Sequence, residues 1–210
     1  MKLWIVVSGK PLEIPPQLGT AEDYARYASA LPESGIEGDI GRTMEGAGRL
    51  LLRAPGRRAA ETARLLFPRD EVRVDARLAA IPRAAPSSGK AALPFPLWRL
   101  LADRQARRGD PRQPESRRES IARCESLLDE LERSRRDTVL LAEESLLPLL
   151  LDRLRLRSYD VQRSGLMGYA PLERLLATAR EEHCGGCGHN CLLSNPGCGI
   201  GRDKAARLRR

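Results

Sequence analysis

Histidine is nearly absent from this chain of 210 residues, since His183 and His189 are the only two and both lie close to the C-terminus. Residues 1–182 therefore offer no imidazole for proton transfer, nucleophilic attack or metal binding. Aromatic residues are scarce, at 4% of the chain, which leaves few surfaces on which single-stranded nucleic acid could stack. No run of about 18 apolar residues is present, so the sequence predicts no membrane-spanning helix.

Lysine is also rare: only four of the 36 basic residues are lysine, and the arginines are spread along the chain. A net charge of +8 would suit a nucleic acid or a membrane surface. Because the arginines are not clustered, we expect neither partner. Met1 leads directly into an apolar run, without the charged and long apolar regions of a signal peptide, which predicts a cytoplasmic protein.

Short apolar runs alternate along the chain with segments of helical periodicity. The runs expected to form strands are 2–8, 50–52, 72–74 and 138–142. The segments expected to form helices are 21–31, 56–67, 97–107, 115–133 and 146–156. This alternation predicts an α/β fold, a three-layer α/β/α sandwich with a mainly parallel sheet.

Two further segments differ from this pattern. Residues 82–114 form a long connection with six prolines, and such connections often cover a site or carry a binding surface. Near residue 178 the apolar pattern stops and a small Cys-rich extension begins, which predicts a domain at 1–178 and a metal-binding tail at 179–210. Cys124, in the expected helix 115–133, is expected to be a small buried or half-buried side chain.

The tail holds the other four cysteines, which fall within 15 residues: Cys184, Cys187, Cys191 and Cys198. The first two form a Cys-x2-Cys pair followed by glycine, as in the knuckle turns of zinc sites. An Asn-Pro-Gly turn at 195–197 would bring the last cysteine back toward the others. Four thiolates suffice for a closed tetrahedral site, and His183 or His189 could replace a ligand or support one.

The spacing leaves three uses of these cysteines open. We expect zinc, while ligation by cysteine alone also suits an iron–sulfur cluster. The third alternative is redox-active or unligated thiols. Disulfides are the less expected use in a cytosolic protein.

Four motifs, in order over residues 1–176, resemble those of the histidine-phosphatase (phosphoglycerate-mutase-like) superfamily. Segment 54–63 reads Ala-Pro-Gly-Arg-Arg-Ala-Ala-Glu-Thr-Ala and is similar to the family's Ser-Pro-x-x-Arg-Ala-x-x-Thr-Ala. The family's first strand ends in Arg-His-Gly, where this chain has Val-Ser-Gly at 7–9. Residues 114–116, Pro-Glu-Ser, resemble a Gly-Glu-Ser ahead of a long helix. The apolar run 139–142 resembles the strand that ends in the family's second catalytic histidine.

The departures from that pattern fall on the catalytic positions. The resemblance implies a phosphohistidine mechanism in which two arginines and two histidines surround the phosphate, but here those positions hold Val7, Ser8, Arg58 and Glu143. The family's general acid falls at Ala80. Only Arg58 survives, and a carboxylate a few ångströms from a phosphate would cost on the order of 4 kcal/mol at an effective dielectric constant near 20.

We therefore expect a degenerate family member without phosphatase activity, in which Ser8, Arg58 and Glu143 form a vestigial phosphate pocket. Its function would be that of a metal-binding or regulatory module with an unidentified protein or small-molecule partner. One alternative is a weak hydrolase with Ser8 as nucleophile and Glu143 as its base. The other is an enzyme of another class that uses a cysteine-ligated metal or cluster. Simpler interpretations are that Glu143 is a solvated carboxylate at a strand end and that Arg58 forms a salt bridge at the start of a helix.

Overall fold

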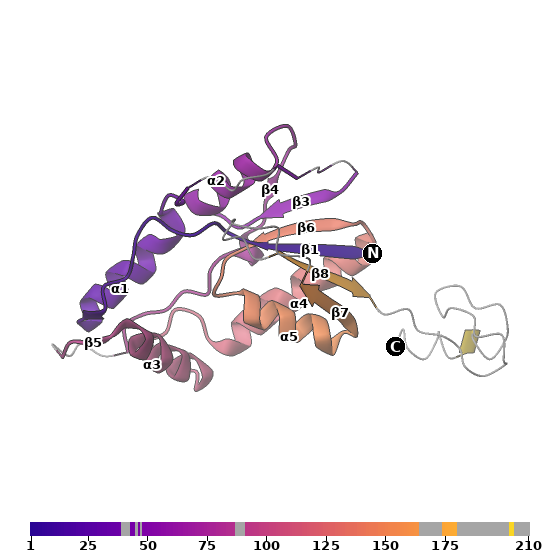
Figure 1. Ribbon diagram of the computed structural model, residues 1–210. Helices are drawn as coiled ribbons and strands as arrows, with labels where there is room; N and C mark the ends of the chain where they lie inside the picture. Colours follow the sequence, from indigo (N-terminus) through magenta and orange to yellow (C-terminus); the bar gives the residue numbers. More distant parts are fainter. Residues whose placement is uncertain are drawn as a thin grey trace.

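The computed structural model describes residues 1–38, 43–44, 46, 48–86, 91–163, 174–179 and 202–203. Its centre is a six-stranded sheet in the order β4-β3-β6-β1-β8-β7 (Figure 1). The first four strands in this order pair in parallel, and β8 and β7 add an antiparallel edge. The strands are β1 (Lys2–Val7), β3 (Leu50–Arg53), β4 (Arg73–Val74), β6 (Thr138–Ala142), β7 (Tyr159–Arg163) and β8 (Arg174–Ala179).

Five α-helices connect or flank these strands in the described part of the chain. They are α1 (Ala21–Ala30), α2 (Arg57–Leu66), α3 (Phe95–Arg107), α4 (Arg117–Ser134) and α5 (Leu147–Leu156). Capping boxes start α1 at Thr20 and α4 at Ser116, each satisfying amide groups of the first turn. Pro148 lies in the first turn of α5, where its missing N–H costs no helical hydrogen bond.

The sheet is buried on both faces because its two central strands are apolar on both sides. On one face Val6, Val139 and Leu141 pack with Leu66 and Phe67 at the end of α2. The opposite face packs against α4 and α5, through a larger cluster that includes Leu3, Ile5, Leu140, Leu128, Leu131, Leu150 and Leu154. All five residues of β6 are buried, as expected for a strand between two helical layers.

A smaller unit of α1 and α3 lies beyond the carboxyl ends of the parallel strands (Figure 1). Tyr24 and Phe95 contact edge to face in its core, which also contains Trp98 and Ala102. The Trp98 indole N–H donates to the Gly19 carbonyl at 2.8 Å, which ties α3 to the short sheet of β2 (Leu18–Gly19) and β5 (Leu93–Pro94). This unit overhangs the strand ends, where open α/β sheets place their sites.

The predicted α/β/α sandwich with a mainly parallel sheet is confirmed, and every predicted strand and helix is present within a few residues. Cys124, predicted to be buried or half-buried, is buried. The sequence pattern did not predict the antiparallel strands β7 and β8 or the strand pair β2–β5. Helix α4 begins at Arg117, not at Glu115, because Ser116 is its N-cap.

None of the helices in the described ranges is both long and apolar enough to cross a membrane. Of the predicted tail 179–210, the structure describes only Ala179, the last residue of β8, and residues 202–203. The division into two parts therefore stays a prediction.

Candidate functional site

Parallel pairing of the central strands brings Ser8 and Glu143 together. Strand β1 pairs with β6 so that Val7 lies opposite Ala142, and the next residue on each strand is Ser8 or Glu143. The Ser8 amide donates to the Ala142 carbonyl at 3.1 Å and continues the ladder to the strand end. Both side chains therefore lie at the carboxyl edge of the sheet.

Arg58 reaches the same place from the first turn of α2, which follows β3. Gly56 starts this helix with φ 98°, and an added Cβ would lie 2.8 Å from the Pro32 carbonyl oxygen. Thr62 then joins α2 to β1: its hydroxyl donates to the Arg58 carbonyl at 2.8 Å and accepts from the Gly9 amide at 2.9 Å. These contacts place the Arg58 side chain beside the ends of β1 and β6.

The three residues form one buried polar cluster. Glu143 is 0% exposed, Arg58 2% and Ser8 6%. One Glu143 carboxylate oxygen pairs with an Arg58 guanidinium nitrogen, and the other accepts from the Ser8 hydroxyl at 3.1 Å. The carboxylate is therefore not solvated, and the interpretation of Glu143 as a solvated strand-end carboxylate is wrong. The salt-bridge interpretation of Arg58 agrees with the pairing observed.

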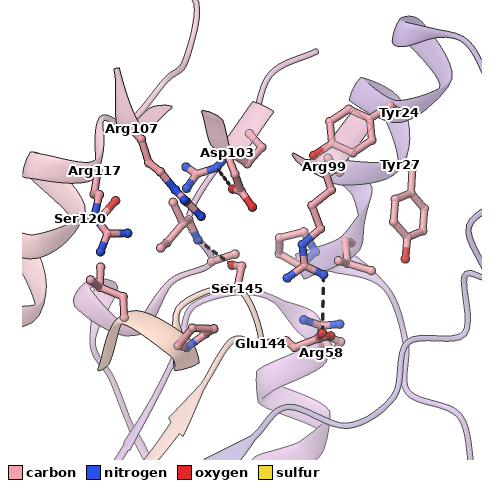
Figure 2. Close-up of a pocket in the computed structure, with 18 residues that line it drawn as sticks. Tyr24, Tyr27, Arg58, Arg99, Asp103, Arg107, Arg117, Ser120, Glu144 and Ser145 are labelled. Atoms are coloured by element: carbon pink, nitrogen blue, oxygen red, sulfur yellow. Dashed lines mark hydrogen bonds and ion pairs between the residues drawn. The ribbon is translucent and has the colours of Figure 1, made fainter. Parts of the chain in front are cut away.

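A cavity of about 270 Å³ lies beside this cluster, between α1, α3 and the start of α4 (Figure 2). Arg58 is the one member of the cluster that lines it. Tyr24, Tyr27 and Leu31 contribute an apolar wall from α1 and the turn after it. The cavity therefore differs from a phosphate pocket centred on the ends of β1 and β6.

Four arginines that sequence reasoning did not select also line this cavity: Arg83, Arg99, Arg107 and Arg117. The first three belong to the proline-rich connection 82–114. The length of this connection was the feature of the sequence that pointed to a binding surface there. Arg83 donates to Asp103 at 2.8 Å, and Arg99 lies 3.8 Å from Glu144 (Figure 2). The length of the connection does not predict which of its arginines line the cavity, because that depends on how α3 packs against α1.

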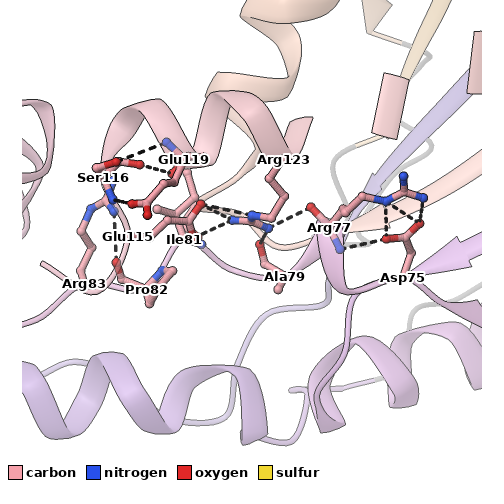
Figure 3. A network of polar contacts seen from close by, with 12 residues as sticks. Asp75, Arg77, Ala79, Ile81, Pro82, Arg83, Glu115, Ser116, Glu119 and Arg123 are labelled. Carbon is pink, nitrogen blue, oxygen red and sulfur yellow. Dashed lines mark hydrogen bonds and ion pairs between the residues drawn. The ribbon is translucent and has the colours of Figure 1, made fainter. Parts of the chain in front are cut away.

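A network centred on Arg123 of α4 positions the adjoining wall of the cavity (Figure 3). Its guanidinium donates to the carbonyls of Arg77 and Ala79, both at 2.9 Å, and pairs with Glu115 at 3.0 Å. Burial tends to raise the pKa of Asp75 at the far end of this loop, but hydrogen bonds from Arg77 outweigh burial and lower that pKa. The loop 76–81, which contributes Ala80 and Ile81 to the cavity, is thus held against α4.

The predicted metal ligands Cys184, Cys187, Cys191, Cys198, His183 and His189 lie outside the described residues. Within the described ranges, no group of three or more histidine, cysteine or acidic residues could hold a metal ion. Cys124 is buried in the core, and burial raises the pKa of its thiol to about 11, so it stays a protonated side chain at neutral pH.

Several solved structures are similar to this chain, among them the following three. The mycobacterial glucosyl-3-phosphoglycerate phosphatase is 25% identical, with a TM-score of 0.43 over 73% of this chain and 81% of that one. The alpha-ribazole phosphatase of Shigella flexneri is 17% identical, with a TM-score of 0.43 over 73% and 79%. The phosphoserine phosphatase of Entamoeba histolytica is 16% identical, with a TM-score of 0.41 over 74% and 80%.

No family model and no curated protein matches the sequence. Likeness of this extent does not define a family or an activity for the chain. The fold class rests on the sheet order and layers described above.

Proposed function

We propose that the chain is a degenerate member of the histidine-phosphatase superfamily that does not transfer phosphoryl groups and acts as a binding module. The motif around Arg58 and the run that ends at Glu143 support the assignment. Its further support is topological, since three positions far apart in sequence meet at one edge of a parallel sheet. That edge is where the resemblance would put a phosphate.

The ion pair between Arg58 and Glu143 is the observation that carries this proposal. A phosphate dianion needs several cationic or N–H donors that converge on it. Here the surviving arginine already pairs with a buried carboxylate, and Val7 stands in place of a second arginine. The charges of Arg58 and Glu143 neutralise each other within the cluster. An incoming phosphate would be repelled by the negative charge of Glu143.

The hydrogen bond from Ser8 to Glu143 favours the rival function, a hydrolase with a serine nucleophile. It has the direction that general-base activation requires. Two observations weigh against this rival. Glu143 would have to accept a proton while it pairs with Arg58, and neither Ser8 nor Glu143 lines the neighbouring cavity. A substrate in that cavity would not reach the hydroxyl without rearrangement.

The Cys-rich tail adds a second, separate element to the proposal. We propose that Cys184, Cys187, Cys191 and Cys198 bind one zinc ion, with an iron–sulfur cluster as the alternative. Its support is the spacing of the cysteines in the sequence. A closed site with four protein ligands would be structural or sensory, whereas three ligands with an open position would favour an enzyme of another class.

Turnover of phosphate esters tests the proposed lack of catalysis. The purified protein is expected to release no phosphate from p-nitrophenyl phosphate or phosphosugars above a heat-inactivated sample, because no histidine lies at the strand ends and the Glu143 carboxylate would repel a phosphate there. Ser8→Ala serves as the matched variant. Turnover by the wild type that disappears in Ser8→Ala would overturn the proposal and establish the serine hydrolase.

A further inference from the structure

The charges around the cavity do not balance within the described part of the chain. Arg58, Arg83 and Arg99 each have a carboxylate partner, in Glu143, Asp103 and Glu144 respectively. Two lining arginines, Arg107 and Arg117, make no hydrogen bond or ion pair with any described side chain, although Arg117 lies near enough to Asp152 to attract its charge. An unpaired cation exposed in a concave site attracts an anion more strongly than one on an open surface.

Both unpaired arginines are exposed residues whose backbone positions are set by helix ends. Arg107 is the last residue of α3 and Arg117 the first residue of α4. Figure 2 shows them at one side of the cavity, near Ser120, with Tyr24 and Tyr27 at the other. The unpaired arginines thus lie at one end of the cavity, and the tyrosines lie at the other together with the ion-paired Arg58 and Arg99.

A second, independent feature is a buried donor in the cavity lining. The Nε of Arg58 is buried and has no hydrogen-bond partner in the described part of the protein, although its Nη2 pairs with Glu143. A buried N–H without an acceptor is costly, and a ligand oxygen or an ordered water would relieve that cost. Arg58 is a lining residue of this cavity and lies on the side of the tyrosines, opposite Arg107 and Arg117 (Figure 2).

We propose that this cavity binds a small organic dianion, with its charged group between Arg107 and Arg117 and its body against Tyr24 and Tyr27. This inference rests on the proposed function as a binding module and names its class of ligand. Two unpaired guanidinium groups match two negative charges, either a phosphate monoester or a dicarboxylate. The volume of about 270 Å³ lies just below the usual range of roughly 300–1,000 Å³ for small-molecule sites and suits a compact metabolite.

Calorimetric titration of the full-length protein tests this inference with four compounds that share a ring. Phenyl phosphate at about pH 8, where its second proton is lost, is one dianion and phthalate is the other. Benzoate supplies one charge and benzyl alcohol none. We expect at least one dianion to bind one per chain, with benzoate at least about tenfold weaker and benzyl alcohol not detected. Which dianion binds distinguishes the phosphate from the carboxylate source.

Variants locate the site. Arg107→Ala and Arg117→Ala are each expected to weaken dianion binding by about tenfold or more, and added salt should weaken it in the wild type. Arg104→Ala is the matched control, because Arg104 is an exposed arginine of α3 that does not line this cavity. It is expected to keep the wild-type affinity within about twofold.

The inference is overturned if both dianions bind the wild type more weakly than about 10 mM. Binding that is unchanged in Arg107→Ala and Arg117→Ala, or equal for benzoate, would also overturn it. Phosphate release from phenyl phosphate is followed in the same samples. Release would refute the proposed lack of catalysis, whereas absent binding without release would refute this inference alone.

Discussion

Replacing Arg58 with methionine is expected to lower the free energy of unfolding by about 3–5 kcal/mol, because it leaves the buried Glu143 carboxylate without its cation. For a chain of this length, each 1 kcal/mol shifts the unfolding midpoint by about 2–4 °C. Thermal unfolding at pH 7 measures the effect. This loss would exceed that of most single substitutions.

Two controls separate the ion pair from the general loss of an arginine. The double variant Arg58→Met/Glu143→Met removes both charges and is expected to recover most of the stability. Arg57→Met changes the neighbouring arginine, whose exposed side chain pairs with Glu61 at 2.7 Å, and should leave the midpoint nearly unchanged. If Arg58→Met unfolded at the wild-type temperature, the buried pair would not be the contact that holds these strand ends together.

Loss of metal on replacement of Cys187 is the second large effect that we expect. Six glycines between Gly185 and Gly201 make this segment costly to order, at about 1–2 kcal/mol of backbone entropy per residue. Its few apolar residues could bury little surface in return. A structural zinc ion contributes about 10–16 kcal/mol in small peptides, which is enough to order such a segment.

Elemental analysis of protein prepared without oxygen measures this effect. The wild type is expected to contain one zinc or iron site per chain, and Cys187→Ser to lose it. A visible absorption spectrum distinguishes an iron–sulfur cluster from zinc. Cys124→Ala is the matched control, because Cys124 is buried in the core and far from the tail in sequence. Wild-type protein free of metal, with a tail open to protease, would rule out the site.

The central layers of the fold could be predicted because the apolar pattern of each segment, taken alone, indicates a buried strand or an amphipathic helix. The segments 3–7 and 139–142 within the predicted strands are apolar at every position, which is typical of strands between two helical layers. Strand β7 reads Tyr-Asp-Val-Gln-Arg and forms through pairing with β8. Its sequence lacks the apolar run of a central strand, so local pattern did not reveal it.

The candidate site could be predicted only as a set of positions. Ser8, Arg58 and Glu143 were selected by their places in motifs, and the structure brings them together. The buried ion pair between Glu143 and Arg58 depends on the register of β1 against β6 and on where α2 begins. Both are features of the tertiary structure that a local sequence pattern does not contain. The arginines of the cavity likewise depend on how α3 and α4 approach each other.

Intact-protein mass spectrometry after incubation with a phosphoryl donor tests the central claim most directly. The claim is that the ends of β1 and β6 no longer form a phosphoryl-accepting site. With p-nitrophenyl phosphate as donor, and handling at neutral or alkaline pH to preserve acid-labile adducts, the wild type is expected to keep its unmodified mass. A phosphoryl adduct that peptide mapping places on Ser8, and that is absent from Ser8→Ala, would contradict it.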